Sequence, residues 1–158
     1  MIEMLGVLAI VGVLSAGGIA GYSMAMQTHK TNQLMEKVQL IALAVRAVYK
    51  GNYEGLSGQN MIDSGKISDV DNPFGGVFSI RKSNFGTDYF VIETGSKKLP
   101  AEVCTDILTS DWGSTGMFSQ IIISGNESNP FWGNNMPFEM SDVISACEGE
   151  NTIKFTFK

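Results

Sequence analysis

The chain has 158 residues, a length that suits one small domain with or without an appended segment. Charged residues make up only 17% of it, against about a quarter in an ordinary soluble domain. The formal net charge is −5, and the excess of acid lies in residues 51–158, so we do not expect this part of the chain to bind nucleic acid.

The first part of the chain is almost free of charge. No charged residue occurs from Met4 to Thr28, and the run from Met4 to Leu14 is almost wholly aliphatic. A helix rises about 1.5 Å per residue, so residues 4–27 are long enough to cross the roughly 30 Å hydrocarbon core of a bilayer. We therefore expect a membrane-spanning helix here. A cleaved secretory signal is the alternative, but it would need a basic start and a shorter apolar core.

Two features distinguish this segment from a simple anchor. Glu3 lies at the edge of the apolar run, where an unpaired carboxylate is costly and is therefore a functional candidate; the alternative is a carboxylate at the headgroup level with no role. Gly12, Gly17, Gly18 and Gly21 fall in the same predicted helix. Small residues let membrane helices approach closely, and glycines weaken a helix, although glycine is also common in membrane helices.

The apolar pattern continues beyond the membrane segment at helical spacing. Apolar residues recur at intervals of three and four, at Leu34, Val38, Ile41, Val45 and Val48. This spacing predicts an amphipathic helix with one buried face. No proline occurs before Pro73, so we expect one helix from about residue 3 to Lys50, ended by Gly51.

Residues 51–158 are predicted to form a globular head. Turn-forming residues separate predicted strands at 77–82, 89–93, 121–123 and 152–158 from predicted short helices at 59–64, 100–109 and 141–147. We expect the remaining segments, including 126–137, to be loops. Strands that follow one long helix and interleave with short helices indicate an α+β head.

Cys104 and Cys147 are the only cysteines. With a single histidine in the chain they cannot form an ordinary zinc site, so a disulfide in an oxidising compartment is the better interpretation. The alternative is two buried free thiols in a cytosolic domain. A disulfide would link the helix predicted at 100–109 to the segment before the final strand. Chain entropy predicts that it stabilises the head by about 4 kcal/mol.

No catalytic constellation is visible in the sequence. His29 is the only histidine, so no Ser-His or Cys-His pair can form in the head. Asp69-Val70-Asp71-Asn72 is similar to a calcium loop, but Pro73 occupies a ligand position and a turn is expected instead. Asn126-Glu127-Ser128 fits an N-glycosylation pattern that often arises by chance. We expect no enzymatic activity, no cofactor and no metal site.

Several aromatic residues of the head have two interpretations. They are Trp112, Phe118, Phe131, Trp132 and Phe138. They can form part of the core or of a subunit interface, or they can form a sticky surface that binds a ligand. The sequence leaves both open.

The N-terminal sequence, Met1-Ile2-Glu3-Met4-Leu5-Gly6-Val7-Leu8-Ala9-Ile10-Val11-Gly12-Val13-Leu14-Ser15, resembles that of type IV pilins and of the related type II secretion pseudopilins. The match covers about residues 1–30. The head is similar to the type IVb (toxin-coregulated pilin) class, because Asn72-Pro73-Phe74 precedes a strand and the two cysteines lie in a helix and just before the final strand. The resemblance implies the pilin fold, a long N-terminal helix packed on a mainly antiparallel sheet in a small C-terminal head.

The same resemblance implies a function. It is that of a major pilin, a structural subunit that polymerises into an extracellular type IV pilus used in processes such as cell adhesion. Residues 1–28 would form the membrane and filament-core half of the helix, and residues 29–50 the half packed on the head. The implied partners are other copies of the chain, the inner membrane before assembly, with the head in the periplasm, the prepilin peptidase and the pilus assembly machinery. The alternatives are a minor pilin, a type II secretion pseudopilin, or a monomeric membrane-anchored extracytoplasmic binding domain.

The resemblance also assigns roles to residues. Glu3 is the only residue able to take the role of the family glutamate, which stabilises docking by attraction to the N-terminal amine of a neighbouring subunit. The stretch from Gly12 to Gly21 corresponds to the part of the helix that can lose helicity in the fibre. The family glutamate is the fifth residue of the mature chain, whereas here it is the third, and the leader that the peptidase cuts is not in this sequence. We therefore do not take Met1 to be the methylated N-terminal residue, and expect a start inside the mature chain or a different terminus.

Overall fold

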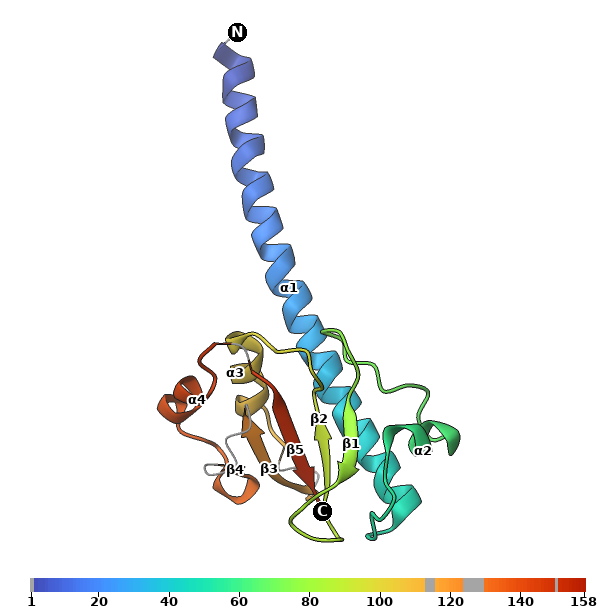
Figure 1. The fold of residues 1–158 in the computed structure, drawn as a ribbon. Coiled ribbons are helices and arrows are strands. Elements are labelled where there is room, and N and C mark those ends of the chain that lie inside the picture. The colour runs from blue at the N-terminus through green and yellow to red at the C-terminus, as the bar shows by residue number, and fades with distance from the viewer. Residues whose placement is uncertain (1, 113–115, 124–129, 150) are drawn as a thin grey trace.

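The computed structural model describes residues 2–112, 116–123, 130–149 and 151–158. One long helix projects from a head in which a sheet is flanked by short helices (Figure 1). The elements in chain order are α1 (Ile2–Tyr49), α2 (Gly58–Asp63), β1 (Ser79–Lys82), β2 (Phe90–Glu93), α3 (Ala101–Thr109), β3 (Phe118–Ile123), β4 (Phe131–Trp132), the 3₁₀ turn η2 (Gly133–Asn135), α4 (Met140–Ala146) and β5 (Ile153–Phe157). The predicted α+β fold with a long N-terminal helix is confirmed.

Helix α1 is continuous over 48 residues, which makes it about 70 Å long. It ends where the sequence predicts, because Lys50 and Gly51 take positive φ angles of 50° and 91°. The Lys50 amide still donates to the carbonyl of Arg46, at 3.0 Å, and closes the last turn. Glycine takes a positive φ without steric cost, so the residue after Lys50 directs the chain out of the helix.

The second half of α1 packs on the head through one face. The buried residues of this face are Leu34, Val38, Ile41, Ala42 and Val45. The prediction for Val48 is wrong, because this residue is 36% exposed. The stripe continues instead through the half-buried Tyr49, whose ring lies 6.3 Å from that of Tyr53. A helical repeat of 3.6 residues after Val45 falls between positions 48 and 49, and the aromatic contact decides between them.

The sheet is antiparallel throughout, in the order β1-β2-β5-β3-β4. The last strand of the chain therefore lies at the centre, where Phe155 is opposite Ile92 on one side and Ile121 on the other. Ile153, Phe155 and Phe157 alternate with polar residues, which predicts one buried face, and all three are buried. The exposure this pattern predicts for Thr156 on the other face is wrong, because Thr156 is buried as well. The core of the head thus depends on the C-terminal strand of the chain.

One segment differs from the prediction. Part of the stretch 126–137, expected to be a loop, contains β4 and η2. Strand β4 has two residues, which pair with Gln120 and Ile121 of β3, and two residues are too few to show an alternating pattern. Residues 124–129, including the glycosylation pattern at Asn126, lie outside the described residues.

The connection from α2 to the sheet is fixed by Asn72. Its buried side chain donates through Nδ2 to the carbonyl of Thr94 (2.9 Å) and accepts through Oδ1 from the amide of Phe74 (3.0 Å). The Asn72 carbonyl accepts from the amide of Gly75 (2.8 Å), which closes the turn predicted here. The Asn-Pro-Phe segment therefore joins the connection to the end of β2.

Candidate functional site

The first half of α1 projects from the head and packs on nothing within the chain (Figure 1). Its large apolar side chains between Met4 and Met24 are 53–75% exposed. The helix is long and apolar enough to cross a membrane, with a window of mean hydropathy 2.1 of which 0% is buried. An apolar surface of this extent needs a cover of lipid or of other protein chains.

Glu3 lies in the first turn of α1 and is exposed. A carboxylate there is favourable to the helix dipole, which gives it a local stabilising effect of its own. The charged residues nearest to it along the helix are Lys30 and Glu36, more than 25 residues away in sequence. At about 1.5 Å per residue this leaves Glu3 roughly 40 Å from Lys30, the next charged residue along α1.

The glycines of α1 have no packing role inside the chain. A Cβ atom added at Gly12, Gly17, Gly18 or Gly21 would meet no atom within 4 Å, and all four residues lie in regular helix. Each costs about 1 kcal/mol of helix propensity relative to alanine in water. Nothing in the described part of the chain therefore requires glycine at these positions.

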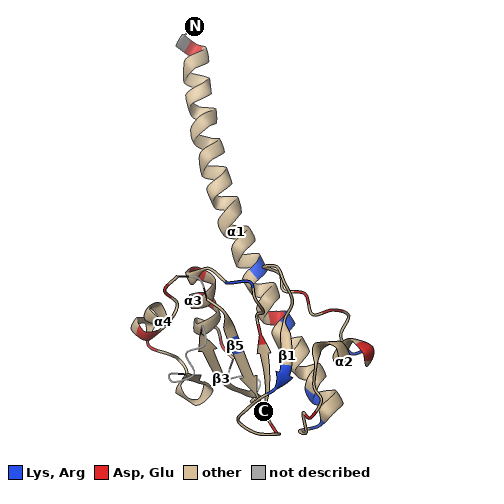
Figure 2. Cartoon of the chain, in the orientation of Figure 1, with Lys and Arg blue, Asp and Glu red and all other residues tan. Residues whose placement is uncertain are grey.

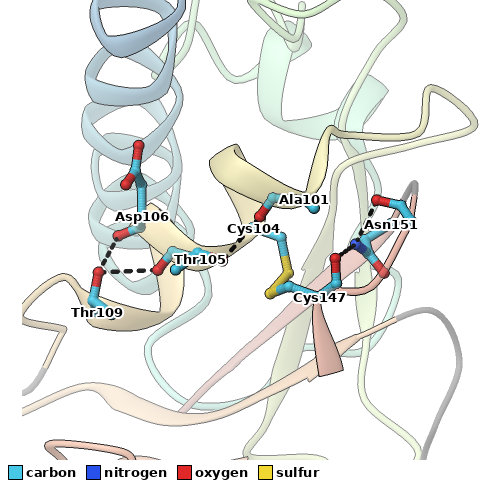
Figure 3. The surroundings of a disulfide bond; sticks show 8 residues. Ala101, Cys104, Thr105, Asp106, Thr109, Cys147 and Asn151 are labelled. Atoms are coloured by element: carbon cyan, nitrogen blue, oxygen red, sulfur yellow. Dashed lines mark hydrogen bonds between the residues drawn. A yellow bond between two sulfur atoms is a disulfide. The ribbon is translucent and has the colours of Figure 1, made fainter. Parts of the chain in front are cut away.

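A disulfide joins Cys104 of α3 to Cys147 at the end of α4, with 5.6 Å between the Cα atoms (Figure 3). The predicted pairing is confirmed, and both residues are buried. Next to the disulfide, the Asn151 side chain donates to the carbonyl of Cys147 at 2.9 Å. The backbones of Asn151 and Leu99 exchange hydrogen bonds of 2.8 and 2.7 Å. These links hold α3, α4 and the start of β5 together.

The aromatic residues of the head divide into two groups. Trp112 and Phe118 belong to the core, where the Trp112 ring lies 4.9 Å from that of Phe155. Phe131 and Phe138 make an edge-to-face contact at 5.0 Å, beside Trp132, which is 43% exposed. Phe118, Phe131 and Phe138 are all half-buried and pack against the core, so the core interpretation is confirmed for these residues and for Trp112, and Trp132 is left exposed.

A cleft of about 880 Å³ lies beside the second aromatic group, between β4 and α4. Its lining includes the side chains of Phe131, Trp132, Phe138, Glu139, Asp142 and Glu148. None of its lining residues in the described part of the chain is Lys or Arg. The cleft therefore combines exposed aromatic surface with negative charge only.

The stretch Asp69-Val70-Asp71-Asn72, which is similar to a calcium loop, forms an ion pair with helix α1. The Asp69 carboxylate accepts hydrogen bonds from Lys37 Nζ of α1, from Ser68 Oγ (3.0 Å) and from the Asp71 amide (3.0 Å). The bond from Lys37 contributes most to a pKa of Asp69 that is lowered to about 2. In the described ranges, no group of three or more His, Cys, Asp or Glu side chains is placed to hold a metal ion. Asp69 instead links the connection between α2 and β1 to helix α1 through its ion pair with Lys37.

Acidic pH is expected to weaken the ion pair between Asp69 and Lys37. Because the folded pKa of Asp69 is depressed, its contribution to stability is complete above the ordinary value of 3.8 and is lost as pH falls towards about 2. Both partners are partly exposed, so solvent screening limits the effect to about 0.2–1 kcal/mol. Asp69→Asn should flatten the fall in unfolding free energy between pH 4 and pH 2, measured by denaturant titration. An unchanged slope in the variant would contradict the assignment.

Comparison with known proteins finds two relatives that align with nearly the whole chain. No family model matches the chain. The major structural subunit of bundle-forming pilus of Escherichia coli O127:H6 (strain E2348/69 / EPEC) is 25% identical over 170 aligned residues, which cover 99% of this chain and 86% of that protein. The protein of the same description from Escherichia coli O111:H- is 24% identical over the same extent. With the long apolar helix and the α+β head, this similarity confirms the predicted resemblance, and the chain is similar over nearly its whole length to type IV pilins of the b class.

Proposed function

We propose that the chain is a structural pilus subunit, a major pilin that polymerises through its N-terminal helix into an extracellular filament. The observation that carries this proposal is the exposed apolar half of α1, in a chain similar over 99% of its length to major pilus subunits. Residues 1–28 would form the filament core, residues 29–50 would pack on the head, and residues 51–158 would form the filament surface.

The driving force for assembly has two parts in this proposal. Transfer of α1 from water to an apolar environment is worth about 1.5–3 kcal/mol for each large side chain, which keeps the subunit in the membrane. Lipid tails are as apolar as leucine, so this term does not favour the filament over the membrane. Two other interactions would make the filament more favourable than the membrane. One is close helix packing at the glycines, and the other is pairing of Glu3 with a neighbour's N-terminal amine. The glycines are Gly12, Gly17, Gly18 and Gly21.

The proposed route follows from the same helix. The subunit would wait in the inner membrane with its head in the periplasm, where the disulfide can form. A prepilin peptidase and a pilus assembly machinery would process the chain and extract it into the filament. The glycine stretch would allow the helix to lengthen locally during this transfer.

The test is to image material sheared from cells that make the chain and from cells that lack it. Fibres in the first sample only, with peptides of this chain as their main component by mass spectrometry, would establish a major pilin. Fibres with only traces of the chain would instead favour a minor pilin. No fibres, with the chain retained in the membrane, would favour a pseudopilin or a monomeric anchored binding domain.

A further inference from the structure

The charges of the chain are divided between two parts of the sequence. Residues 99–153 contain eight Asp and Glu and no Lys or Arg. All 11 basic residues and the other eight acids lie outside this segment, which gives −8 for the segment and +3 for the rest, and together these make the net charge of −5. The segment begins directly after Lys98 and includes α3 and α4.

In the fold these two parts lie on different sides of the head. Acidic residues mark α3 and α4, β1 is basic, and α1 carries both basic and acidic residues beside the head (Figure 2). The exposed acids of the described part of the segment are Glu102, Asp106, Asp111, Glu139, Asp142 and Glu148. Helix α4 lies on the opposite side of the head from α2 (Figure 1). The exposed charges on helices α3 and α4 are therefore all acidic.

The acidic side also carries unpacked apolar side chains. Only Val143 of α4 is buried, while Met140 and Ile144 are 53% and 56% exposed. These two residues are four apart and lie on one face of the helix. Ile144 lines a shallow depression between α3 and α4 together with Asp106 and Glu148. The exposed face of α4 thus has an apolar centre and an acidic border.

An exposed apolar stripe with cations at one end lies on α1. Leu40 and Leu43 are more than half exposed, although they lie in the part of α1 that packs on the head. Arg46 follows Leu43 by three residues and lies on the same stripe of the helix, and the exposed Lys50 comes directly after the last residue of α1. The exposed acid Glu36 lies four residues before Leu40, so the apolar centre of the stripe has an acid before it and cations after it, at the end of the helix.

We propose that the α4 face, formed by Met140, Ile144, Asp106 and Glu148, docks on the α1 stripe of a second copy of the chain, formed by Leu40, Leu43, Arg46 and Lys50. This inference rests on the proposed function, because bundled α1 helices place neighbouring heads side by side in one orientation. Copies related in this way meet through two different faces, and such a contact can repeat along a helical polymer without closing. Opposite charge on the two faces favours the correct register and opposes contact of two acidic faces.

The apolar part is tested by Met140→Gln with Ile144→Gln. The matched control is Val77→Gln with Phe85→Gln, because these residues are about equally exposed, at 53% and 59%, but flank β1, which lies at the sheet edge opposite to β4. The yield of sheared fibres should fall about tenfold for the α4 variant, the loss expected when interface contacts are removed, and should be unchanged for the control. Melting of the detergent-solubilised subunit should be unchanged in both variants, since all four side chains are exposed. Equal yields from both variants would overturn the proposal.

The charged part is tested by a swap between Glu148 and Lys50. Glu148→Lys and Lys50→Glu should each lower fibre yield, and the chain with both changes should recover it, because the pair is restored with reversed sign. A double variant no better than the worse single variant would overturn the pairing. Absence of fibres from the wild type would reject the proposed function itself, whereas normal wild-type fibres without any effect of these changes would reject only the docking surface.

Discussion

Replacing Glu3 by alanine is expected to lower the amount of surface fibre at least about a hundredfold, at an unchanged level of subunit in the membrane. Glu3 stands alone at the start of a segment with no other charged residue before Lys30. In our proposal it meets the N-terminal amine of a neighbour inside an apolar bundle of helices. Removal of one member of such a pair leaves the other charge buried and unpaired, at a cost of about 3–5 kcal/mol for each docking event.

The measurement is quantitative imaging of sheared fibres, with immunoblots of the membrane fraction. Glu36→Ala is the matched control, since Glu36 is also an exposed acid of α1 but lies in the half that packs on the head. Glu3→Gln keeps the size of the side chain and removes its charge, so it should behave like Glu3→Ala. Abundant fibres from both Glu3 variants would leave the pilin function standing and remove the proposed role of Glu3.

Glu3 is recognisable in the sequence as a candidate because its signal is local, and its role stays a prediction. A single acid beside 25 uncharged residues needs no knowledge of the fold to be noticed. The same holds for α1, whose length and two-part apolar pattern are set by neighbours three and four residues apart. The cysteine pair was predictable for a different reason, namely that two cysteines and one histidine leave few other uses.

The arrangement of the sheet could not be predicted in this way. The alternation from Ile153 to Phe157 predicts a strand with one buried face, yet nothing in it indicates a place between β2 and β3. Strand order depends on contacts between residues far apart in the chain, which a local pattern does not record. Gln120 and Thr156, polar residues opposite each other in β3 and β5, are buried for the same reason. The alternation in residues 152–158 predicts an exposed position for Thr156.

The acidic face of α4 shows the same limit for function. That residues 99–153 lack any basic residue can be read from the sequence. That Ile144 lies beside Asp106, and that Met140 is left uncovered, requires the packing of α4 on α3. A contact surface made from two helices joined by a disulfide becomes visible only in the folded head.

Loss of the disulfide should destabilise the head by about 4 kcal/mol, because the link closes a loop between residues 43 apart and so restricts the unfolded chain. Cys104→Ala with Cys147→Ala is preferred to serine, which would bury two hydroxyl groups. For a head of roughly 100 residues this corresponds to a Tm lower by about 15–30 °C, measured on the full chain in detergent by circular dichroism. Wild-type chain in reductant should melt close to the variant, and this comparison separates the crosslink from the small cavities that alanine leaves.

The disulfide should also have a local effect on α4. This helix buries only Val143, so Cys147 and the bonds of Asn151 supply much of what holds it to α3. In the cysteine-free variant, amides of α4 should exchange hydrogen earlier than those of β5, which is paired on both sides at the centre of the sheet. Fibre yield should then fall even at temperatures where the head stays folded, because the proposed docking face moves with α4. Uniform exchange across α4 and β5 would mean that the disulfide acts only through global stability, and that the α4 face does not need it.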